Sequence, residues 1–449
     1  MLDTLGIMRA LVSPSVRSTY LVVAFVTILA GDVWRYSTGW VGFGIVVALL
    51  AAYAVMLLVH HRDRWSPTAL PIGLSVFLAL VTLSLLWSQY RDATALGILA
   101  TWLPVVAGVA IAVSYDWPAI VRGLGTALRL LIGSSLVFEA VVAFVVRAPV
   151  LPLVPQPGID YDSYDRIPLM LFWSRAELLE VADDGRIQGV VGNSSLLAFL
   201  ALLALIVFAV ELLQSRRVGR TVFDRGRDTR LILWIVAAVA TLLFTRSATV
   251  TISVVLLALL VGAALVVRHA RRRALAYGVV GGLAAAGLVV AVVGRATWLE
   301  LLGKSDTLTG RVGIWADVAA LAQQRPVAGW GWVGYWAPWT EPFASLHFRN
   351  GVRQLHAHNA WLDVWLQLGV IGLLVVGFLV LGTLARSWFL AVDPPVGTRR
   401  DATHWLPLLI MAALVIQSLA ESRLIVEYGL LLTALIAVKT AAPRVELTR

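Results

Sequence analysis

The 449-residue chain contains no cysteine, which excludes disulfide bonds, thiolate nucleophiles and cysteine-ligated metals. Charged residues are also scarce, at 14% of the chain, whereas hydrophobic residues make up 59%. A soluble domain of this length could not bury so much apolar surface. The composition therefore indicates an integral membrane protein.

Apolar runs recur along the chain at about 20 residues each, the length at which an α-helix crosses a bilayer. Strand-like alternation does not interrupt them. We therefore predict an all-α, polytopic membrane protein in which residues 1–449 form a single transmembrane domain of about 12 helices. The predicted spans are 19–32, 39–59, 69–87, 94–114, 119–146, 190–213, 231–245, 248–267, 275–293, 360–385, 405–420 and 424–440.

The net charge of +10 is concentrated in short basic tracts between the apolar runs. Four tracts fall on one side of the membrane if every predicted span is real, and basic loops mark the cytoplasmic side. Both termini are then cytoplasmic, and the positive charge reports topology, with no nucleic acid as a partner. The four tracts are 60–64, 214–230, 268–273 and 398–400.

This orientation places two long loops outside, at 147–189 and at 294–359. Between Pro155 and Asp184 the first loop has seven acidic residues against two arginines, which is typical of a solvated outer loop. The second loop is large and lies between the ninth and tenth predicted helices.

Within the second loop, apolar residues at Val312, Trp315 and Val318 follow helical spacing, and Pro326 ends the run. We predict an amphipathic helix over 311–325 that lies on the membrane surface.

Ionisable residues gather near the predicted external pole. Arg246 lies in the short turn FTRSAT, Glu139 in the outer half of its helix, and Glu421, Arg423 and Glu427 at the external end of the last two helices. Each such group costs roughly 2.5–3.5 kcal/mol to insert at membrane depth, so a cluster indicates either a functional site or mutual ion pairs.

Residues 355–365 read LHAHNAWLDVW, so two histidines, an asparagine and an aspartate stand where the second loop enters an apolar helix. If the helix begins near His358, Asp363 lies about one and a half turns further on. An imidazole exchanges its proton near neutral pH, which makes His358 a candidate general base for a sugar hydroxyl. Asn359 and Asp363 are candidates to orient it or to bind substrate, together with His356.

Two arginines on the same side, Arg246 and Arg311, could hold a diphosphate through forked, charge-assisted hydrogen bonds. A general base together with two arginines that bind a diphosphate indicates group transfer from a lipid diphosphate. Two alternatives stay open. His356 could merely cap the helix, and His347 could join His356 and His358 as a metal site, although their spacing matches no defined ligand motif.

The stretch HNAWLDVWLQLGVIG resembles the signature of the O-antigen ligase and Wzy-type polymerase superfamily, and His358, Asn359, Gly369 and Gly372 fit its positions. Elsewhere, TGRVGIWADV followed by RPVAGWGW resembles the family's external-loop element, FTRSAT its serine-arginine turn, and GVVGNSSLLA the start of a middle span. The resemblance covers roughly residues 185–430, and the first five spans match only in hydropathy.

The resemblance implies a GT-C-like, inverting glycosyltransferase that needs no metal or other cofactor. It would transfer an oligosaccharide or polysaccharide from undecaprenyl diphosphate to an acceptor glycan or lipid, at the outer face of the bacterial plasma membrane. His358 would be the base, with Arg311 and Arg246 on the diphosphate. The further residues that we expect to contact substrate are His356, Asn359, Asp363 and Glu421.

Two other classes of protein predict different sequence patterns. A transporter or flippase of lipid-linked sugars should have broken helices and polar groups near the membrane midplane in paired repeats. Here the polar groups gather at one pole and no repeat is evident. A structural scaffold would not explain the histidine and the arginines at this pole.

Overall fold

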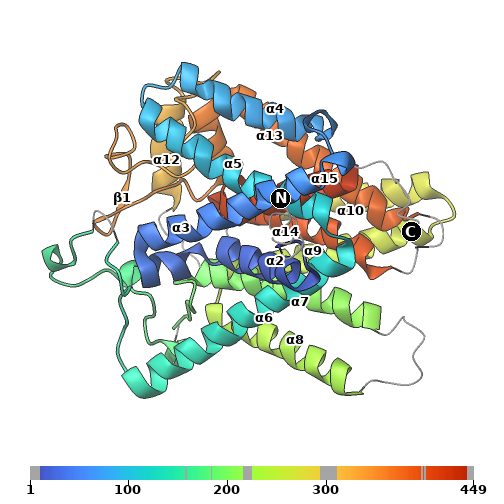
Figure 1. The fold of residues 1–449 in the computed structure, drawn as a ribbon, viewed down its shortest axis with the longest axis horizontal. Coiled ribbons are helices and arrows are strands. Elements are labelled where there is room, and N and C mark those ends of the chain that lie inside the picture. The colour runs from blue at the N-terminus through green and yellow to red at the C-terminus, as the bar shows by residue number, and fades with distance from the viewer. Residues whose placement is uncertain are drawn as a thin grey trace, which may run out of the picture.

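The computed structural model describes residues 11–156, 159–183, 185–215, 225–293, 311–395, 398 and 401–441. Several predicted features lie outside these residues. They are the two termini that we predict to be cytoplasmic, the first part of the 294–359 loop and parts of two basic tracts. Helices dominate, with one short hairpin (Figure 1). The elements are α2 (Pro14–Leu29), α3 (Gly31–His60), α4 (Ile72–Leu83), α5 (Arg91–Ser114), α6 (Trp117–Val141), α7 (Ser194–Ser215), α8 (Arg225–Thr245), α9 (Ala248–His269), α10 (Arg273–Val293), α12 (Arg311–Ala322), β1 (Phe348–Arg349), β2 (Val352–Arg353), α13 (Ala360–Val392), α14 (Leu406–Ser418) and α15 (Glu427–Ala441).

The predicted all-α class of a polytopic membrane protein is confirmed. Each of the predicted spans overlaps a helix of the structure. Among the described residues, 7 helices are long and apolar enough to cross a membrane, or up to 8 if the bent pair Arg62–Ala69 and Ile72–Leu86 is one span. The larger count and the GT-C architecture stay predictions.

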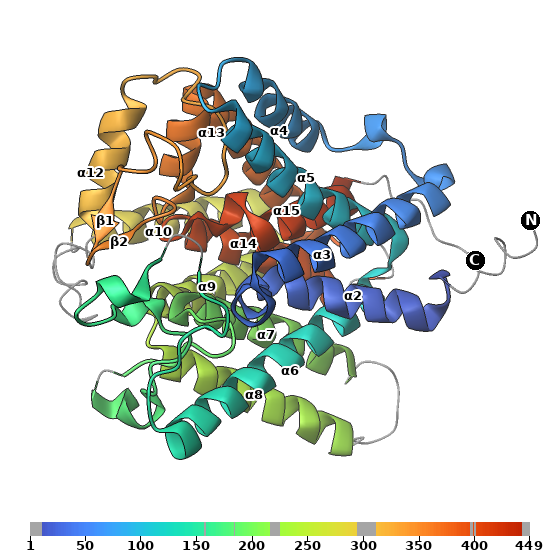
Figure 2. The same cartoon turned by 60° about the vertical axis from the view of Figure 1, so that its left-hand side comes forward.

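The helices form a bundle (Figures 1 and 2). Some helices lie in its interior, and others lie at its periphery. Helix α15 packs against α5, and α7 packs against α8 and α6. In the apolar window of α7, 72% of residues are buried, against 17% for α3, so α7 belongs to the interior and α3 to the periphery. Peripheral helices expose large apolar side chains that a bilayer would cover, among them Val41, Leu233 and Leu259.

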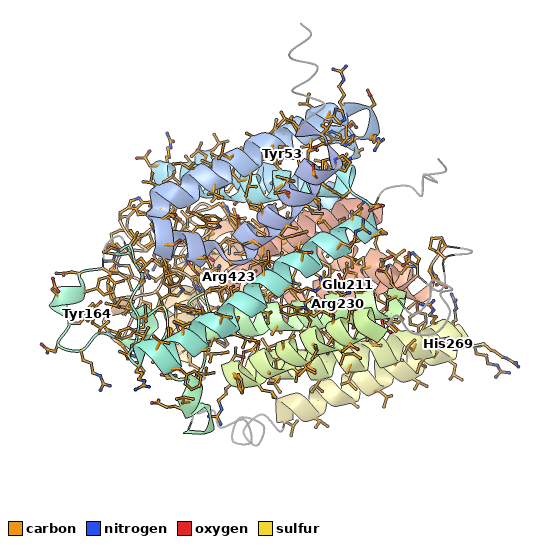
Figure 3. The ribbon with its side chains drawn as sticks, turned by 60° about the horizontal axis from the view of Figure 1, so that its bottom comes forward. Tyr53, Tyr164, Glu211, Arg230, His269 and Arg423 are labelled. Atoms are coloured by element: carbon orange, nitrogen blue, oxygen red, sulfur yellow. The ribbon has the colours of Figure 1, made fainter. Side chains whose placement is uncertain are left out.

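Loops and basic tracts separate along the bundle. Tyr164, in the predicted outer loop 147–189, and His269, in the basic tract 268–273, lie at opposite ends of the helices (Figure 3). This is the separation that the topology prediction requires. Which end faces the cytoplasm stays a prediction.

Helix α12 packs against α13 and the neighbouring loop (Figure 2). Its buried residues include Ile314, Val318 and Leu321, whereas Val312 is 47% exposed. The buried face therefore matches the predicted apolar face in part, through Val318, and the placement of the helix on the membrane surface stays a prediction. Because this face contacts α13 and the loop, the buried side of the helix is covered by protein.

Helix α13 is broken at Gly369, whose φ of 65° and ψ of −162° are not helical. The break leaves the carbonyl groups of Leu366 and Gln367 without helical donors. The backbone N–H groups of Trp330 and Gly331, in the segment after α12, donate to them at 3.0 and 2.9 Å. The loop that follows α12 is thus joined to α13 by backbone hydrogen bonds. This junction holds the loop in place beside the helix.

Replacing Gly369 by alanine is expected to destabilise this junction by roughly 2–4 kcal/mol. A Cβ at Gly369 would lie 2.1 Å from the carbonyl oxygen of Val327, and the positive φ adds backbone strain. Gly377→Ala is the matched control, because a Cβ there meets nothing within 4 Å on the same helix. The measurement is the thermal midpoint of the purified protein. Equal midpoints for the two variants would contradict the close approach.

Candidate functional site

A cavity of about 1600 Å³ opens at the end of the bundle that carries loops 147–189 and 311–359. Its polar part is lined by residues of the segments 349–358 and 421–427, with Arg246 and Arg311. Its apolar part reaches between α3 and α5, where it is lined by Trp40, Phe43, Val47, Leu96 and Leu103. A charged site and an apolar cleft are therefore continuous.

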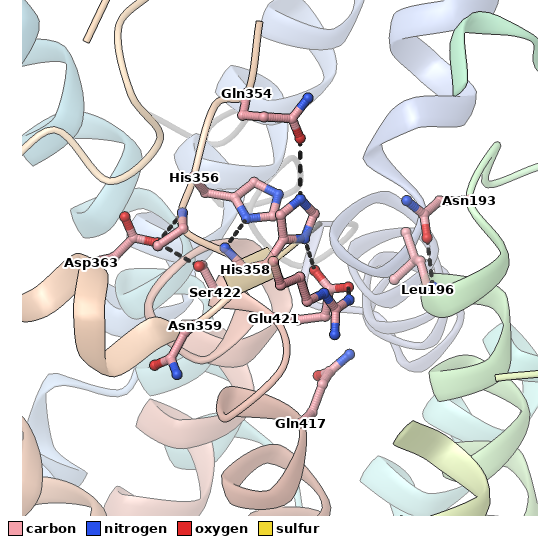
Figure 4. A network of polar contacts seen from close by, with 12 residues as sticks. Asn193, Leu196, Gln354, His356, His358, Asn359, Asp363, Gln417, Glu421 and Ser422 are labelled. Carbon is pink, nitrogen blue, oxygen red and sulfur yellow. Dashed lines mark hydrogen bonds and ion pairs between the residues drawn. The ribbon is translucent and has the colours of Figure 1, made fainter. Parts of the chain in front are cut away.

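His358 lies in the polar part, one residue before the cap of α13. Its Nδ1 is 3.1 Å from Oε2 of Glu421, and its Nε2 is 3.3 Å from Oε1 of Gln354 (Figure 4). With the side-chain amide as assigned, both partners are oxygen atoms, and this arrangement suits the imidazolium, the form that a general base reaches after taking a proton. His358 has a φ of 50°, a backbone conformation uncommon outside glycine.

The ring of His356 lies against that of His358, with centroids 4.1 Å apart and the two planes tilted by 57°. Burial, together with the charge of His358, lowers the pKa of His356 well below its ordinary value. A neutral ring leaves Nδ1 free to accept, and the backbone N–H of His358 donates to it at 3.1 Å. His356 therefore helps to hold the unusual backbone conformation of its neighbour and does not cap the helix.

Glu421 joins the histidine to an arginine. Its Oε1 accepts from Arg311 at 2.9 Å while its Oε2 faces His358. Burial alone would raise the pKa of Glu421, but His358 and Arg311 outweigh it and lower the pKa to about 2. The carboxylate is ionised at neutral pH, so it orients the Nδ1–H tautomer of His358 and stabilises the imidazolium.

The helix cap is supplied by Asn359. Its side-chain oxygen accepts from the backbone N–H groups of Trp361 and Leu362 at 3.0 and 3.2 Å. An asparagine at this position satisfies two of the orphan donors of α13. Asn359 is absent from the cavity lining, so its observed contacts position the loop.

Asp363 is fully buried and points to the other side of the loop (Figure 4). Its Oδ1 accepts from Nε1 of Trp336 at 2.8 Å, and its Oδ2 accepts from the backbone N–H of Ala357 at 3.0 Å and from the hydroxyl of Ser422. These contacts tie the loop that carries His358 to α13 and to the segment after α14. Asp363 does not line the cavity.

Arg246 lines the cavity at the turn between α8 and α9. The turn residue has a φ of 47°, and its backbone N–H donates to the carbonyl of Leu243 at 3.2 Å. The structure thus brings five of the seven predicted site residues to one cavity. These are His358, Arg311, Arg246, His356 and Glu421.

The potential metal ligands differ from the trio considered in the sequence. Within the described residues, His356, His358 and Glu421 have ligand atoms within 4.8 Å of one another. His347 is not in this group, and its Nδ1 lies 2.7 Å from Oδ2 of Asp317. The lone pair of His356 Nδ1 and both oxygens of Glu421 already have partners in the protein.

A second ionic network borders the cavity. The sequence analysis named its members Arg423 and Glu427 as candidates for ion pairing but missed Asp32 and Arg35. Arg35 of α3 contacts Asp32 at 2.8 Å and Glu427 at 2.9 Å, and Arg423 contacts Glu427. The guanidinium of Arg35 also lies over the ring of Trp40, 5.1 Å from its centroid. Asp32 and Arg35, three residues apart at the start of an apolar helix, were the available signal. Gln354 carried no local signal.

The fold and site define a multi-pass membrane protein whose cavity joins a carboxylate, an imidazole and arginines to an apolar cleft. Residues 231–377 match the family model described as O-Antigen ligase. Over 216 residues the chain is 30% identical to the exopolysaccharide production protein ExoQ of Rhizobium meliloti (strain 1021). That match covers 45% of this chain and 48% of the relative, so the chain spans about half the length of the curated relative it matches.

These similarities confirm the predicted resemblance to the O-antigen ligase-like family. The matched range runs from α8 into α13 and contains Arg246, Arg311, His356 and His358, whereas Glu421 lies beyond it.

Proposed function

We propose that the chain transfers an oligosaccharide or polysaccharide from undecaprenyl diphosphate to an acceptor hydroxyl at the outer face of the bacterial plasma membrane. The acceptor is a glycan or a lipid, so the activity is that of a surface polysaccharide ligase or polymerase. The observation that carries the proposal is the chain of contacts from Arg311 through Glu421 to His358, within a cavity that continues into an apolar cleft.

His358 acts as the general base in this proposal. Glu421 holds Nδ1–H, and Nε2 takes the proton of the acceptor hydroxyl. The acceptor oxygen forms a bond to the anomeric carbon while the bond from that carbon to the diphosphate oxygen breaks. The electron pair leaves with the lipid diphosphate. A single displacement inverts the anomeric configuration.

After the acceptor has been deprotonated, the side-chain oxygen of Gln354 is placed to accept a hydrogen bond from the Nε2–H of His358. The imidazolium is then flanked by a carboxylate and an amide oxygen, which stabilise it. Before the transfer, the acceptor hydroxyl takes the place of the amide at Nε2, because the single lone pair of that nitrogen accepts from one donor at a time.

Arg246 and Arg311 hold the diphosphate. Guanidinium groups bind phosphate oxygens in a bidentate manner and stabilise the charge that develops as the diphosphate leaves. The polyprenyl chain lies in the cleft between α3 and α5, which is continuous with the arginines. Membrane lipids cover the exposed apolar faces beside that cleft.

The reaction needs no metal in this proposal, because the two arginines supply the positive charge that a cation would otherwise provide. The candidate ligand atoms of His356 and Glu421 are occupied by the backbone N–H of His358, by Arg311 and by the imidazole. Nor does the break at Gly369 favour a transporter. The carbonyl groups that it frees are bonded to the segment after α12 and do not line the cavity.

The proposal is tested in nanodiscs with undecaprenyl-diphosphate-linked glycan, extracted from cells that lack this chain, as the donor. Transfer to an acceptor is expected to proceed without nucleotide sugar and to survive EDTA, because no step depends on a cation. The readout is the loss of donor and the appearance of larger glycan on gels. Absence of transfer would refute the activity. Loss on chelation, restored by Zn²⁺, would show that the group of His356, His358 and Glu421 binds an essential metal.

A further inference from the structure

The cavity holds more positive charge than the proposed reaction uses. Within the described part of the chain, eight arginines line it against four carboxylates. Three of the arginines, Arg35, Arg311 and Arg423, form ion pairs with three of those carboxylates, Asp32, Glu421 and Glu427. Arg246 is assigned to the diphosphate. Four arginines remain, and among the residues that the structure describes Glu177 is the only carboxylate left beside them in the lining. The four are Arg175, Arg186, Arg349 and Arg353.

These four residues, the outer arginine cluster, have few partners of their own. Arg175 and Arg353 each donate one Nε–H to a backbone carbonyl, at 3.1 and 2.7 Å. Within the part of the chain that the structure describes, the guanidinium groups of Arg186 and Arg349 form no hydrogen bond or ion pair. Burial lowers the pKa of Arg175; Glu177 opposes this effect, and the charge of Arg186 adds to it. A bound anion would offset the cost of keeping this buried guanidinium charged.

The segments that carry the cluster are held in place. Arg349 and Arg353 lie on the hairpin β1–β2, where Arg349 pairs with Val352 across a turn formed by Asn350 and Gly351, both with positive φ. Arg175 and Arg186 lie on a loop that is anchored from within. The buried carboxylate of Glu139 accepts from the hydroxyl of Ser174 at 2.8 Å and from the backbone N–H groups of Gln188 and Gly189 at 2.9 and 2.7 Å.

The position of the cluster indicates its ligand. A diphosphate on a membrane-anchored lipid stays near the apolar cleft, whereas the glycan extends away from it. The cluster lies on the loop after α6 and on the hairpin β1–β2, both at one end of the bundle (Figures 1 and 2), where the glycan would extend from the lipid. Planar guanidinium groups pair with carboxylates in forked geometry.

We propose that the outer arginine cluster binds the carboxylate of an acidic sugar in the glycan and thereby selects acidic repeat units. This inference rests on the proposed function for its setting, but the binding site itself can be tested without transfer. Arg186 and Arg349 make the main contacts, since their guanidinium groups are uncommitted.

The probe is the trimer of galacturonic acid, compared with its methyl ester, which has the same sugars without the charges. Binding is measured in nanodiscs of phosphatidylcholine, for the parent and for the double variant Arg186→Gln, Arg349→Gln. The parent is expected to bind the acid and not the ester. The double variant is expected to bind the acid roughly 10-fold more weakly, and added salt is expected to weaken binding to the parent. Arg166→Gln is the matched control, because Arg166 is an exposed arginine of the same loop that does not line the cavity.

Three results would overturn the inference: equal binding of acid and ester, unchanged binding in the double variant, or displacement of the acid by phosphatidylglycerol in the disc. The last would show that the cluster binds lipid headgroups. A glycan from the native donor that contains no acidic sugar would also overturn it. Failure of the proposed function differs from all four, because then the parent would bind the trimer and yet transfer no glycan.

Discussion

Replacing His358 by alanine is expected to lower the turnover of glycan transfer by roughly 10²–10⁴-fold, the usual contribution of a general base. The imidazole of His358 lies between Glu421 and the cavity, and its Nε2 takes the acceptor proton in this mechanism. Donor binding is expected to change little, because the diphosphate contacts come from Arg246 and Arg311. The measurement is the single-turnover rate and the donor affinity of each variant in nanodiscs.

Two other histidine variants are the controls for this experiment. His356→Ala removes the acceptor for the backbone N–H of His358, so it should lower the rate much less. His347→Ala removes a histidine that contacts Asp317 and lies outside the cavity lining, so it should leave the rate unchanged. Full activity in His358→Ala, with normal expression, would show that another group is the base.

The helices of this chain could be predicted because apolar runs of spanning length are a strong signal. The breaks inside them could not. Gly39 and Gly369 lie in apolar runs, and only tertiary packing distinguishes them from Gly377, which is an ordinary helical residue. The hairpin was missed as well. Asn350–Gly351 is a strong turn signal, but strands of two residues carry no periodicity.

For the site, the sequence identified residue types better than contacts. The prediction assumed that the helix begins near His358, which would bring Asp363 within about a turn and a half. In the structure His358 has a φ of 50° and precedes the cap, so the carboxylate of Asp363 turns into the protein. The carboxylate that reaches the imidazole belongs to Glu421, which is 63 residues further along the chain. No local spacing encodes that contact.

The two ionic groups at the cavity show how distant segments fix the site. Arg35 connects the start of α3 to Glu427 at the start of α15, and Arg311 connects α12 to Glu421. Both carboxylates flank the short segment between α14 and α15, so elements from both ends of the chain converge there. Ion pairs buried in this way stabilise one arrangement of the helices, because breaking either pair would leave a buried charge without a partner.

Glu421→Gln is expected to lower turnover by roughly 10²-fold, because the carboxylate both orients His358 and pairs with Arg311. The pKa of Glu421 is lowered to about 2, so the stability that its charge contributes is present above its ordinary pKa and is lost only as the pH falls through about 2. Between about pH 5 and 9 the parent therefore keeps the carboxylate ionised. Over that pH range, Glu421→Gln therefore removes a negative charge that the parent protein carries.

The pH–rate profile separates positioning from mere folding in this variant. Without the adjacent negative charge the imidazolium is less stable, so the acid limb of the profile is expected to move to lower pH while the maximum rate falls. A variant that is only less well folded would have a lower maximum rate, but the acid limb of its profile would stay at the same pH. Glu341→Gln is the matched control, since Glu341 is exposed, contacts Ser345 and does not line the cavity. A Glu421→Gln profile that superimposes on the parent after scaling would show that Glu421 supports the fold and does not act through His358.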